Sequence, residues 1–467
     1  MQILSDYIKK INNICNREKT EVYMVGGAVR DYFINQKTED IDLVLNRRVE
    51  KIARYFADDI KGSLVILDES RQIFRVVIKD GIIFDFTKMT GNNIEEDLLS
   101  RDFTINAIGI SLNELVNKDL ENIFSFNNIS NKLIDPTGGL TDLQERKLEV
   151  VSDGVFRDDP LRIWRALRFR VVYGFGFTKR LEKLLIRDYS LSNSAAAERI
   201  HKEIVEIFRE KKIAEVIADI EDKFNLISAL VNPVDALKQT GKNKYHSENA
   251  WKHSCLALKE LEKVLEKLYF SKLISEKNIY MLKLAALFHD IGKVKARHKK
   301  GDRIHYYGHE KVGADVMKYQ LRRLKFSRSE IKYITGIIRY HMRPMMLYLA
   351  DNLTIKGKVR FYRDAGKLSI PVLVLSLADK TSSMLINKRD DEIVKYRNFI
   401  KGMLAEYDKY TARTEILLLT GADIIELFNL SEGPEIGRLL IKVKTAQALD
   451  IIKTRDEAVA YLKNIIN

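Results

Sequence analysis

Cysteine is rare in this chain of 467 residues, where only Cys15 and Cys255 occur. Two thiols argue against the multi-cysteine disulfide frameworks of small secreted domains and against zinc sites built from cysteines. Long apolar runs are also missing, because no segment approaches the roughly 20 residues that cross a bilayer. The opening segment, MQILSDYIKKINNIC, places charges within an amphipathic pattern and does not resemble a secretory signal. We therefore expect a cytoplasmic protein with no membrane partner.

Negative charge is in deficit, since 79 Lys and Arg residues outnumber 65 Asp and Glu residues and give a formal net charge of +14. General lysine enrichment can produce such a total without any partner, so the distribution matters. Residues 157–212 hold 14 basic against 8 acidic side chains, and residues 289–343 hold 15 against 5. Concentrated basic residues favour a polyanionic partner that is contacted along its phosphates. The chain length predicts two to four domains.

The most informative stretch is residues 23–45, YMVGGAVRDYFINQKTEDIDLVL. An apolar strand runs into Gly26 and Gly27, a helix is expected to begin near residue 28, and a second strand carries Asp40 and Asp42. Side chains two positions apart on a strand point the same way, so the two aspartates form a carboxylate pair. Bare glycines before a helix let backbone N–H groups approach phosphates, and paired carboxylates hold divalent metals. Each motif alone is more often a structural turn or a solvated strand end.

The combination of GGAVRD with DID resembles the class II tRNA nucleotidyltransferase and bacterial poly(A) polymerase family, a branch of the DNA polymerase beta superfamily. The resemblance implies that Asp40 and Asp42 are catalytic and bind Mg²⁺. It also implies that Gly26, Gly27 and Arg30 bind the nucleotide. It extends over almost the whole chain.

Residues 20–110 alternate short apolar strands with helical segments, which predicts a head domain with a mixed sheet and helices. Beyond the two strands of the opening motif, three more are expected, at residues 63–67, 74–79 and 82–87. Asp85 lies among apolar neighbours in the last of them. Two interpretations stand level: a strand-end aspartate, or an additional metal-binding carboxylate.

Residues 95–112, EEDLLSRDFTINAIGISL, resemble the family's RRDFTINA stretch, with Ser100 in place of the first arginine. The resemblance implies nucleotide contacts for Arg101, Asp102 and Asn106, and we expect an apolar helix to follow Asp102. A helix-capping aspartate is the alternative. The later segment DPTGGLTDL, residues 135–143, is typical of a turn with a helix cap. In the family it joins the head to a helical neck.

Residues 157–177, RDDPLRIWRALRFRVVYGFGF, place Arg162, Arg165 and Arg168 on one slowly drifting face of a helix. A basic helix face is usually only solvated. Here a carboxylate pair precedes it, and guanidinium groups suit base edges and triphosphates. The segment resembles the family's EDxxR motif, with Asp158 in place of glutamate. The resemblance implies that Asp159 and Arg162 read CTP or ATP without a nucleic-acid template.

Histidine and aspartate recur in order through the second half of the chain. A lone histidine on an apolar helix is more often a core residue, but this set resembles the HD phosphohydrolase superfamily. The resemblance implies a divalent metal, with Mg, Mn, Ni and Fe left open, and four metal ligands: His253, His289, Asp290 and Asp379. His309 and His341 match the extra ligands of two-metal members.

The fold class implied by these observations is α+β, with a DNA polymerase beta-like head followed by an all-α remainder. Four domains are predicted: a head at 1–145, a neck at 146–225, an HD domain at 245–385 and an RNA-contacting tail at 386–467. The implied partners are CTP, ATP and the acceptor arm at the tRNA 3′ end. The oligomeric state stays open.

The implied reaction is template-independent, two-metal addition of C residues or CCA to tRNA 3′ ends, with an HD phosphohydrolase activity as a possible addition. The short segment 88–94 resembles CC-adding enzymes, which have a shortened loop at this place, and full CCA addition follows closely. A poly(A) polymerase is a near rival, because it shares the head motifs. A different class of function is an HD phosphatase or 2′,3′-cyclic phosphodiesterase whose head only binds RNA. A basic RNA-binding protein without activity is the remaining alternative.

Overall fold

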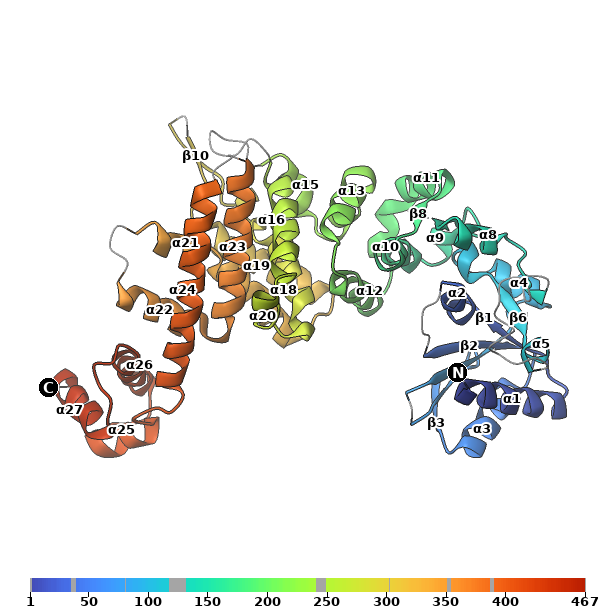
Figure 1. Ribbon diagram of the computed structural model, residues 1–467, viewed down its shortest axis with the longest axis horizontal. Helices are drawn as coiled ribbons and strands as arrows, with labels where there is room; N and C mark the ends of the chain where they lie inside the picture. The colour runs from blue at the N-terminus through green and yellow to red at the C-terminus, as the bar shows by residue number, and fades with distance from the viewer. Residues whose placement is uncertain are drawn as a thin grey trace. The chain divides into compact units, whose positions relative to one another are not determined.

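The structure is a computed structural model that describes residues 2–34, 39–79, 81–116, 132–240, 249–301, 303–350, 354–386 and 390–466. Contacts between residues divide the chain into two compact units, residues 1–196 and 197–467. The boundary between the units falls inside the segment predicted as a neck. Figure 1 colours the elements along the chain.

A six-stranded mixed sheet forms the centre of the first unit, in the order β3-β4-β5-β2-β1-β6. Strand β2 pairs antiparallel with β1 and parallel with β5. The remaining neighbours in this sheet pair antiparallel. The strands are β1 (Val22–Val25), β2 (Asp40–Leu45), β3 (Ser63–Asp68), β4 (Ile73–Val77), β5 (Ile83–Lys88) and β6 (Gly109–Ser111).

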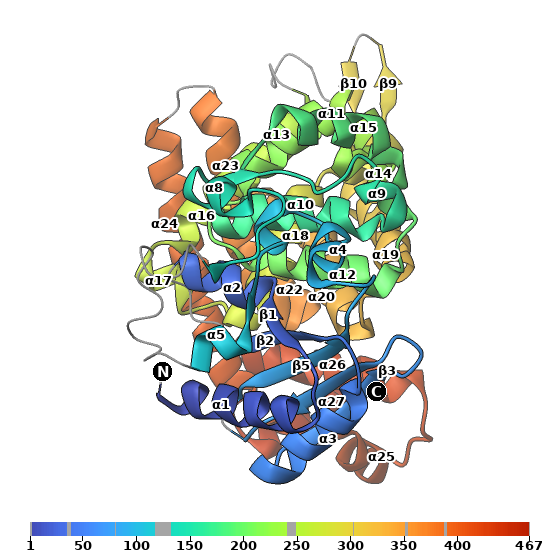
Figure 2. The same ribbon diagram turned by 90° about the vertical axis from the view of Figure 1, so that its right-hand side faces the viewer.

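Helices α1 (Gln2–Arg17) and α3 (Val49–Ile60) lie together against the sheet (Figure 2). Buried aromatic residues join α3 to the middle of the sheet, where the ring of Phe56 meets that of Phe84 edge-on at 5.2 Å. Phe84 and Phe86 point to this face of β5 because strand residues two apart share a face. The opposite face of β5 is left for Asp85.

The segment after Asp102 differs from the expected apolar helix. Helix α4 (Ile94–Leu99) ends before it, and a short 3-10 turn, η1 (Thr104–Asn106), leads directly into β6. Periodicity cannot distinguish a short buried strand from a buried helix. Pairing with β1 decides the outcome, since Val25 lies opposite Gly109 in the sheet.

The rest of the first unit is mostly helical. Asp135 accepts hydrogen bonds from the backbone N–H groups of Gly139 and Leu140 at 2.8 and 2.9 Å, so the predicted cap at this helix is confirmed. The elements are α5 (Leu112–Val116), α8 (Gly139–Gln144), β7 (Lys147–Leu148), α9 (Val155–Asp158), α10 (Leu161–Tyr173), β8 (Gly176–Phe177), α11 (Lys179–Asp188) and η3 (Tyr189–Asn193).

The second unit is helical apart from one hairpin, β9 (His298–Lys300) with β10 (Arg303–His305), within the part that the structure describes. Its first elements are α12 (Ala197–Arg209), α13 (Ala214–Phe224), α14 (Leu226–Leu230), α15 (Pro233–Lys238), α16 (Ala250–Leu265), α17 (Leu268–Ser271), α18 (Glu276–Phe288) and η4 (Ile291–Val294). The remainder are α19 (His309–Arg323), α20 (Arg328–Tyr340), α21 (Met342–Tyr348), α22 (Ile355–Ala365), η5 (Gly366–Leu368), α23 (Ser369–Ile386), α24 (Asp390–Thr414), α25 (Gly421–Phe428), α26 (Pro434–Ala448) and α27 (Arg455–Ile466).

Helices α16, α18 and α23 form the packed centre of the second unit, with α24 alongside α23 (Figure 1). The helix expected over residues 284–293 ends at Phe288, and a separate 3-10 turn follows. The predicted α+β organisation is confirmed, with a mixed sheet and helices first and a largely helical remainder. The short pairs β7–β8 in the predicted neck and β9–β10 in the predicted HD segment depart from the expected all-α arrangement there.

The two cysteines are buried as free thiols, Cys15 in α1 and Cys255 in α16. Burial raises the pKa of the Cys15 thiol to about 12, and it raises that of Cys255 further. Among the residues that the structure describes, no helix is both long enough and apolar enough to cross a bilayer.

Candidate functional site

The glycine turn at the end of β1 is closely covered by charged side chains. Gly26 has a φ of +66°, and a methyl group built on it would lie 2.9 Å from Nη1 of Arg101 and 3.4 Å from Oδ2 of Asp42. A methyl group on Gly27 would lie 3.6 Å from the same Asp42 oxygen. A side chain at Gly26 is therefore disfavoured by the positive φ, whereas the Arg101 guanidinium is the end of a flexible side chain and can move aside.

Three carboxylates gather beside this turn. Asp40 and Asp42 lie on β2, and Asp85 lies directly opposite Asp42 on the parallel strand β5. Burial, together with the negative charges of Asp85 and Asp40, raises the pKa of Asp42, while Arg101 and Arg30 oppose the rise. A divalent cation would relieve this repulsion, so the donor set fits a metal that prefers oxygen ligands.

Asp85 does not end its strand, and its charge is shared with an arginine. Arg75 on β4 lies opposite Asp85 and donates two hydrogen bonds to it, from Nε at 2.8 Å and from Nη2 at 2.7 Å. This fork-shaped pairing holds the carboxylate in place. Arg75 was not among the residues selected from the sequence, although its β4 position opposite Asp85 would have indicated it once the strand register was known. A metal-binding role for Asp85 stays a prediction.

Arg30, Asn106, Asp102 and Arg165 form a chain of hydrogen bonds from α2 (Gly27–Phe33) to α10. Arg30 Nη1 donates to Asn106 Oδ1 at 2.6 Å, and Asn106 Nδ2 donates to Asp102 Oδ1 at 2.9 Å. Arg165 Nε then donates to Asp102 Oδ2 at 2.7 Å. Burial alone would raise the pKa of Asp102, but Arg165 and Asn106 outweigh it and lower the pKa to about 2.

The Arg30 guanidinium also lies over two aromatic rings of α10, with centroid distances of 5.0 Å to Phe169 and 4.8 Å to Tyr173. It donates to Asp31 and to the Tyr173 hydroxyl at 2.6 and 3.0 Å. Arg30 and Asn106 are buried, so the structure presents them as parts of a fixed network behind the turn. Nucleotide contacts by them stay a prediction.

The helix predicted to carry three arginines is α10. The Asp159 carboxylate accepts a hydrogen bond from the Leu161 backbone at 3.1 Å and so caps this helix. Arg162 Nη2 donates to the Ser100 carbonyl at 3.1 Å, and the Arg168 guanidinium lies 5.4 Å from the centroid of Phe169. Arg162 and Arg165 therefore lie against residues 100–102, next to the Arg101 that approaches the turn.

A second set of ionisable side chains converges in the second unit, which we name the histidine–aspartate centre. Its members come from five different helices and their ends: His253, His289, Asp290, His309, His341 and Asp379. His253 Nε2 lies 2.8 Å from Asp379 Oδ1 and 3.8 Å from Asp290 Oδ2. His309 Nε2 lies 3.2 Å from Asp290 Oδ1.

Three histidines of the centre are oriented in the same way by backbone carbonyls. Nδ1 of His289 lies 2.8 Å from the Ala286 oxygen, and Nδ1 of His341 lies 2.7 Å from the Ile338 oxygen. Nδ1 of His309 makes the same contact with Tyr306 at 2.9 Å. A carbonyl oxygen can only accept, so each contact places a proton on Nδ1 and turns Nε2 toward the centre, the orientation in which an imidazole can bind a metal through Nε2.

The Nε2 atoms of these histidines point into the centre, and one of them, on His289, has no hydrogen-bond partner. His289 Nε2 is buried and makes no hydrogen bond, and it lies 3.5 Å from Asp290 and 3.6 Å from Asp379. Burial, with the positive charge of neighbouring histidines, lowers the pKa of His341 to about 3, so this imidazole is neutral. Burial would also lower the pKa of His289, but Asp290 and Asp379 outweigh this effect and raise that pKa to about 9. Buried imidazoles facing two carboxylates fit a divalent metal with nitrogen and oxygen ligands, which would displace such a proton.

Lys293 borders the histidine–aspartate centre, and the sequence analysis did not single it out. Its ammonium group lies 2.5 Å from Asp290 Oδ2, and Asp290 keeps a pKa well below its usual range against the effect of burial. The i,i+3 spacing from Asp290 across η4 is the only signal that would have found it.

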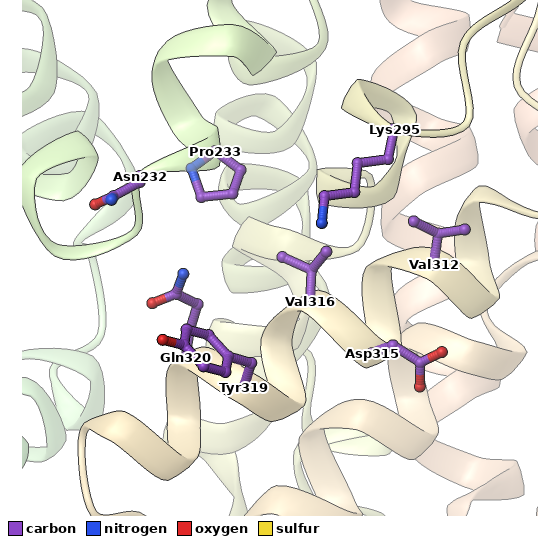
Figure 3. Close-up of a pocket in the computed structure, with 8 residues that line it drawn as sticks. All are labelled: Asn232, Pro233, Lys295, Val312, Asp315, Val316, Tyr319 and Gln320. Carbon is purple, nitrogen blue, oxygen red and sulfur yellow. The ribbon is translucent and has the colours of Figure 1, made fainter.

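A separate pocket of about 430 Å³ lies between α15, the end of η4 and one face of α19 (Figure 3). None of the six residues of the histidine–aspartate centre lines it. Its charged groups are Lys295 and Asp315, and Arg339 donates to Asp315 at 3.2 Å. No motif pointed to this pocket.

Comparison with known proteins gives two family matches. The model for the poly A polymerase head domain matches residues 22–149, and the model for the HD domain matches residues 245–384.

Full-length relatives are also found. The chain is 28% identical to the A-adding tRNA nucleotidyltransferase of Deinococcus radiodurans, with 94% of each chain covered. It is 27% identical to the CC-adding tRNA nucleotidyltransferase of Thermus thermophilus, covering 95% of this chain and 93% of the relative. Its fold is similar to that of the Thermotoga maritima CCA-adding enzyme solved with tRNA, with a TM-score of 0.64, 20% identity, and coverage of 100% and 96%.

Proposed function

Because the chain belongs to the class II tRNA nucleotidyltransferase family, with a poly A polymerase head and an HD domain, we propose that it adds C residues to tRNA 3′ ends from CTP. The observation that carries the proposal is the meeting of the bare glycine turn with the carboxylates of β2. This arrangement supports a phosphate-binding turn beside a metal-binding pair.

In the proposed reaction, the 3′-hydroxyl oxygen of the RNA bonds to the α-phosphorus of CTP. The bond from that phosphorus to the bridging oxygen breaks, the hydroxyl proton is released, and pyrophosphate leaves. Asp40 and Asp42 would hold two Mg²⁺ ions, which when bound lower the pKa of the attacking hydroxyl and stabilise the leaving oxygen. The negative charges of Asp40 and Asp85 close to Asp42 support the binding of cations there.

Recognition of the base is assigned to α10. Asp159, just before this helix, offers a carboxylate acceptor, and Arg162, on its first turn, offers a guanidinium donor, which suits the exocyclic amine and ring acceptors of cytosine. The network from Arg165 through Asp102 and Asn106 to Arg30 supports their placement, because it ties this helix to the turn. Contact with the triphosphate is assigned to Arg101, whose Nε and Nη2 pair with Asp97 at 3.2 and 3.0 Å while Nη1 lies toward the glycine turn.

The preference for C addition rests on the segment between β5 and α4. Only residues 89–93 separate these elements, and Asn93 already caps α4 by accepting from the Glu96 backbone at 2.9 Å. A segment this short and capped cannot rearrange widely. It therefore favours one nucleotide over a switch from CTP to ATP, as in CC-adding members of the family.

A second activity, phosphohydrolysis, is favoured by the histidine–aspartate centre. The residues of the histidine–aspartate centre would hold a divalent metal, whose chemistry would be to polarise a phosphate ester and activate water. Water would add to phosphorus while the P–O bond to the sugar breaks and the sugar oxygen takes up a proton. The orphan His289 Nε2 and the three oriented imidazoles support this proposal.

The test of C addition uses three tRNA transcripts, ending before the CCA tail, after the first C, and after CC. Each is incubated with Mg²⁺ and CTP, ATP or both, and sized at single-nucleotide resolution. With CTP, we expect the transcript without the tail to grow by two residues and the transcript ending in the first C to grow by one. The transcript that ends in CC should not grow. Growth by three with both nucleotides would replace this proposal with CCA addition, and a long A tract would indicate a poly(A) polymerase.

Replacement of Asp42 by Asn tests the carboxylate pair. We expect nucleotide incorporation to fall by at least roughly 1,000-fold, because a metal ligand is lost, while tRNA binding stays within about twofold. The matched control is Asp58→Asn, which neutralises an exposed aspartate of α3. An Asp42→Asn protein that still incorporates CTP would remove Asp42 from the mechanism.

The HD activity is tested with His289→Ala and an RNA ending in a 2′,3′-cyclic phosphate. We expect this variant to lose hydrolysis and to keep nucleotide addition. Full hydrolysis by His289→Ala would remove the centre from this reaction. Absence of nucleotide addition in the wild-type protein, with hydrolysis present, would make hydrolysis its main activity.

A further inference from the structure

The hairpin of β9 and β10 lies between two residues of the histidine–aspartate centre along the chain. We name residues 295–301 and 303–307 the arm. The ligand Asp290 lies just before η4, which leads into the arm, and the ligand His309 follows it at the start of α19. Figure 2 shows both strands extending beyond the helices of this unit. The arm is therefore anchored at each end by a residue of the centre.

The arm is strongly basic. Four cations on it are exposed: Lys295, Arg297, Lys299 and Lys300. Among the residues that the structure describes, no carboxylate forms an ion pair with any of these four. Uncompensated cations at this density repel one another, so a polyanion that binds them gains affinity by releasing counterions.

The arm also carries a stacked pair of rings, of which His305 is half-buried and Tyr307 is exposed to solvent. His305 and Tyr307 lie parallel, with centroids 5.0 Å apart and an interplanar angle of 8°. Tyr307 is 78% exposed, although a large ring in water is unfavourable unless a partner covers it. Flat rings next to cations form the usual platform for unpaired bases, whose π-faces stack irrespective of sequence.

The base of the arm supports the centre itself. The carbonyl of Tyr306 accepts from His309 Nδ1, and the Lys293 ammonium lies 6.0 Å from the centroid of the Tyr306 ring. Lys293 also pairs with Asp290. An RNA strand bound along the arm would thus end near the histidine–aspartate centre.

We infer that the arm binds single-stranded RNA, with phosphates on Arg297, Lys299 and Lys300 and a base on the Tyr307–His305 stack, and directs its end to the histidine–aspartate centre. The inference rests on the proposed function in taking RNA as the polyanion. Duplex RNA is disfavoured because its bases are stacked internally and cannot cover Tyr307.

The test is photocrosslinking of the full chain to a 12-nucleotide RNA that contains 4-thiouridine near its 3′ end, with adducts mapped by mass spectrometry. We expect adducts at His305 or Tyr307. The triple variant R297A/K299A/K300A and the variant Tyr307→Ala should each lower their yield by about 10-fold. Tyr307→Phe, which keeps the ring, should retain the yield.

Matched controls change the same groups elsewhere in the HD segment. K267A/K272A/K277A removes three exposed lysines, and Tyr269→Ala removes an exposed ring. Neither should lower the yield. Manganese bound per chain, measured in every variant, should equal the wild-type value, because the substituted side chains are exposed and bind no metal.

Three results would overturn the inference: adducts only outside the arm, equal losses in the control variants, or a Tyr307→Ala protein that crosslinks like wild type. Nucleotide addition to tRNA is measured on the same proteins. Arm variants that crosslink normally while CTP addition proceeds would reject the arm and leave the proposed function intact. If the wild-type protein forms adducts at the arm but adds no nucleotides, the inference about the arm would stand and the proposed function would be rejected.

Discussion

The buried ammonium group of Lys283 in α18 stabilises the turn between two helices. Its ammonium donates to the carbonyls of Glu210 and Lys211 and lies 3.2 Å from Glu262. Glu262 accepts in turn from the backbone of Ile213 at 2.8 Å. The pair therefore closes the turn between α12 and α13, and burial lowers the pKa of Lys283.

Replacing Lys283 by Met is expected to lower the free energy of unfolding by about 3 to 5 kcal/mol. The reason is that Glu262 stays buried without its counter-ion and two carbonyls lose a donor. Urea unfolding measures the change. Lys277→Met, at an exposed position of the same helix, should change stability by less than about 0.5 kcal/mol. Equal stabilities would mean that water replaces the ammonium.

Asp102 predicts a pH dependence. Its pKa is lowered in the folded chain to about 2, against roughly 3.9 unfolded, so its ionisation stabilises the fold above about pH 4. This contribution, about 2 to 3 kcal/mol, is lost as the pH falls from 4 towards 2. Urea midpoints of wild type and Asp102→Asn should differ most at pH 7 and converge towards pH 3. A pH-independent difference, or an equal effect of Asp58→Asn, would contradict this account.

At the scale of elements, two glycines let η4 pack directly on α19. A methyl group built on Gly292 would lie 2.0 Å from the His309 oxygen and 2.5 Å from the Gly313 nitrogen. The contact is backbone against backbone, so no side chain can move aside. It sets the separation of Asp290, before η4, from His309, the first residue of α19.

Gly292→Ala is therefore expected to push η4 away from α19 and to weaken metal binding at the centre by at least about 10-fold, with a stability loss of a few kcal/mol. Metal titration and urea unfolding report the two effects. Gly402→Ala is the control, because nothing lies within 4 Å of its added methyl group and helix propensity favours alanine there. Unchanged metal affinity in Gly292→Ala would show that the loop adjusts.

The elements also show how far the sequence could predict this molecule. The glycine turn, β2 and the capped α8 were predictable because their signals are local. Arg75 was not, since its pairing with Asp85 depends on the register of β4 against β5. The strand β6 was expected as a helix, because a short buried run has no distinguishing period.

The candidate sites divide in the same way. His289 and Asp290 are adjacent in sequence, but their meeting with Asp379 follows from the packing of α16, α18 and α23. The resemblance supplied this set, and local spacing did not. The carbonyls that orient His289, His309 and His341 carry no sequence signal, because every residue has one.

At the scale of the whole molecule, the net charge of +14 makes binding of tRNA dependent on salt. If about six phosphates are contacted, the dissociation constant for a tRNA transcript should rise by roughly 1,000-fold between 50 and 200 mM KCl. Filter binding measures this slope. K267A/K272A/K277A should keep the slope, because these lysines lie outside the two basic concentrations. A dissociation constant that does not change with KCl concentration would exclude phosphate contacts as the main source of affinity.

The two buried thiols have a practical consequence for studying the chain in solution. Cys15 and Cys255 are both buried, and burial disfavours the reactive thiolate of each. A maleimide dye should therefore ignore the native protein. One cysteine placed at an exposed position such as Lys299 would take the label alone, so fluorescence from the arm can be followed in an otherwise wild-type chain.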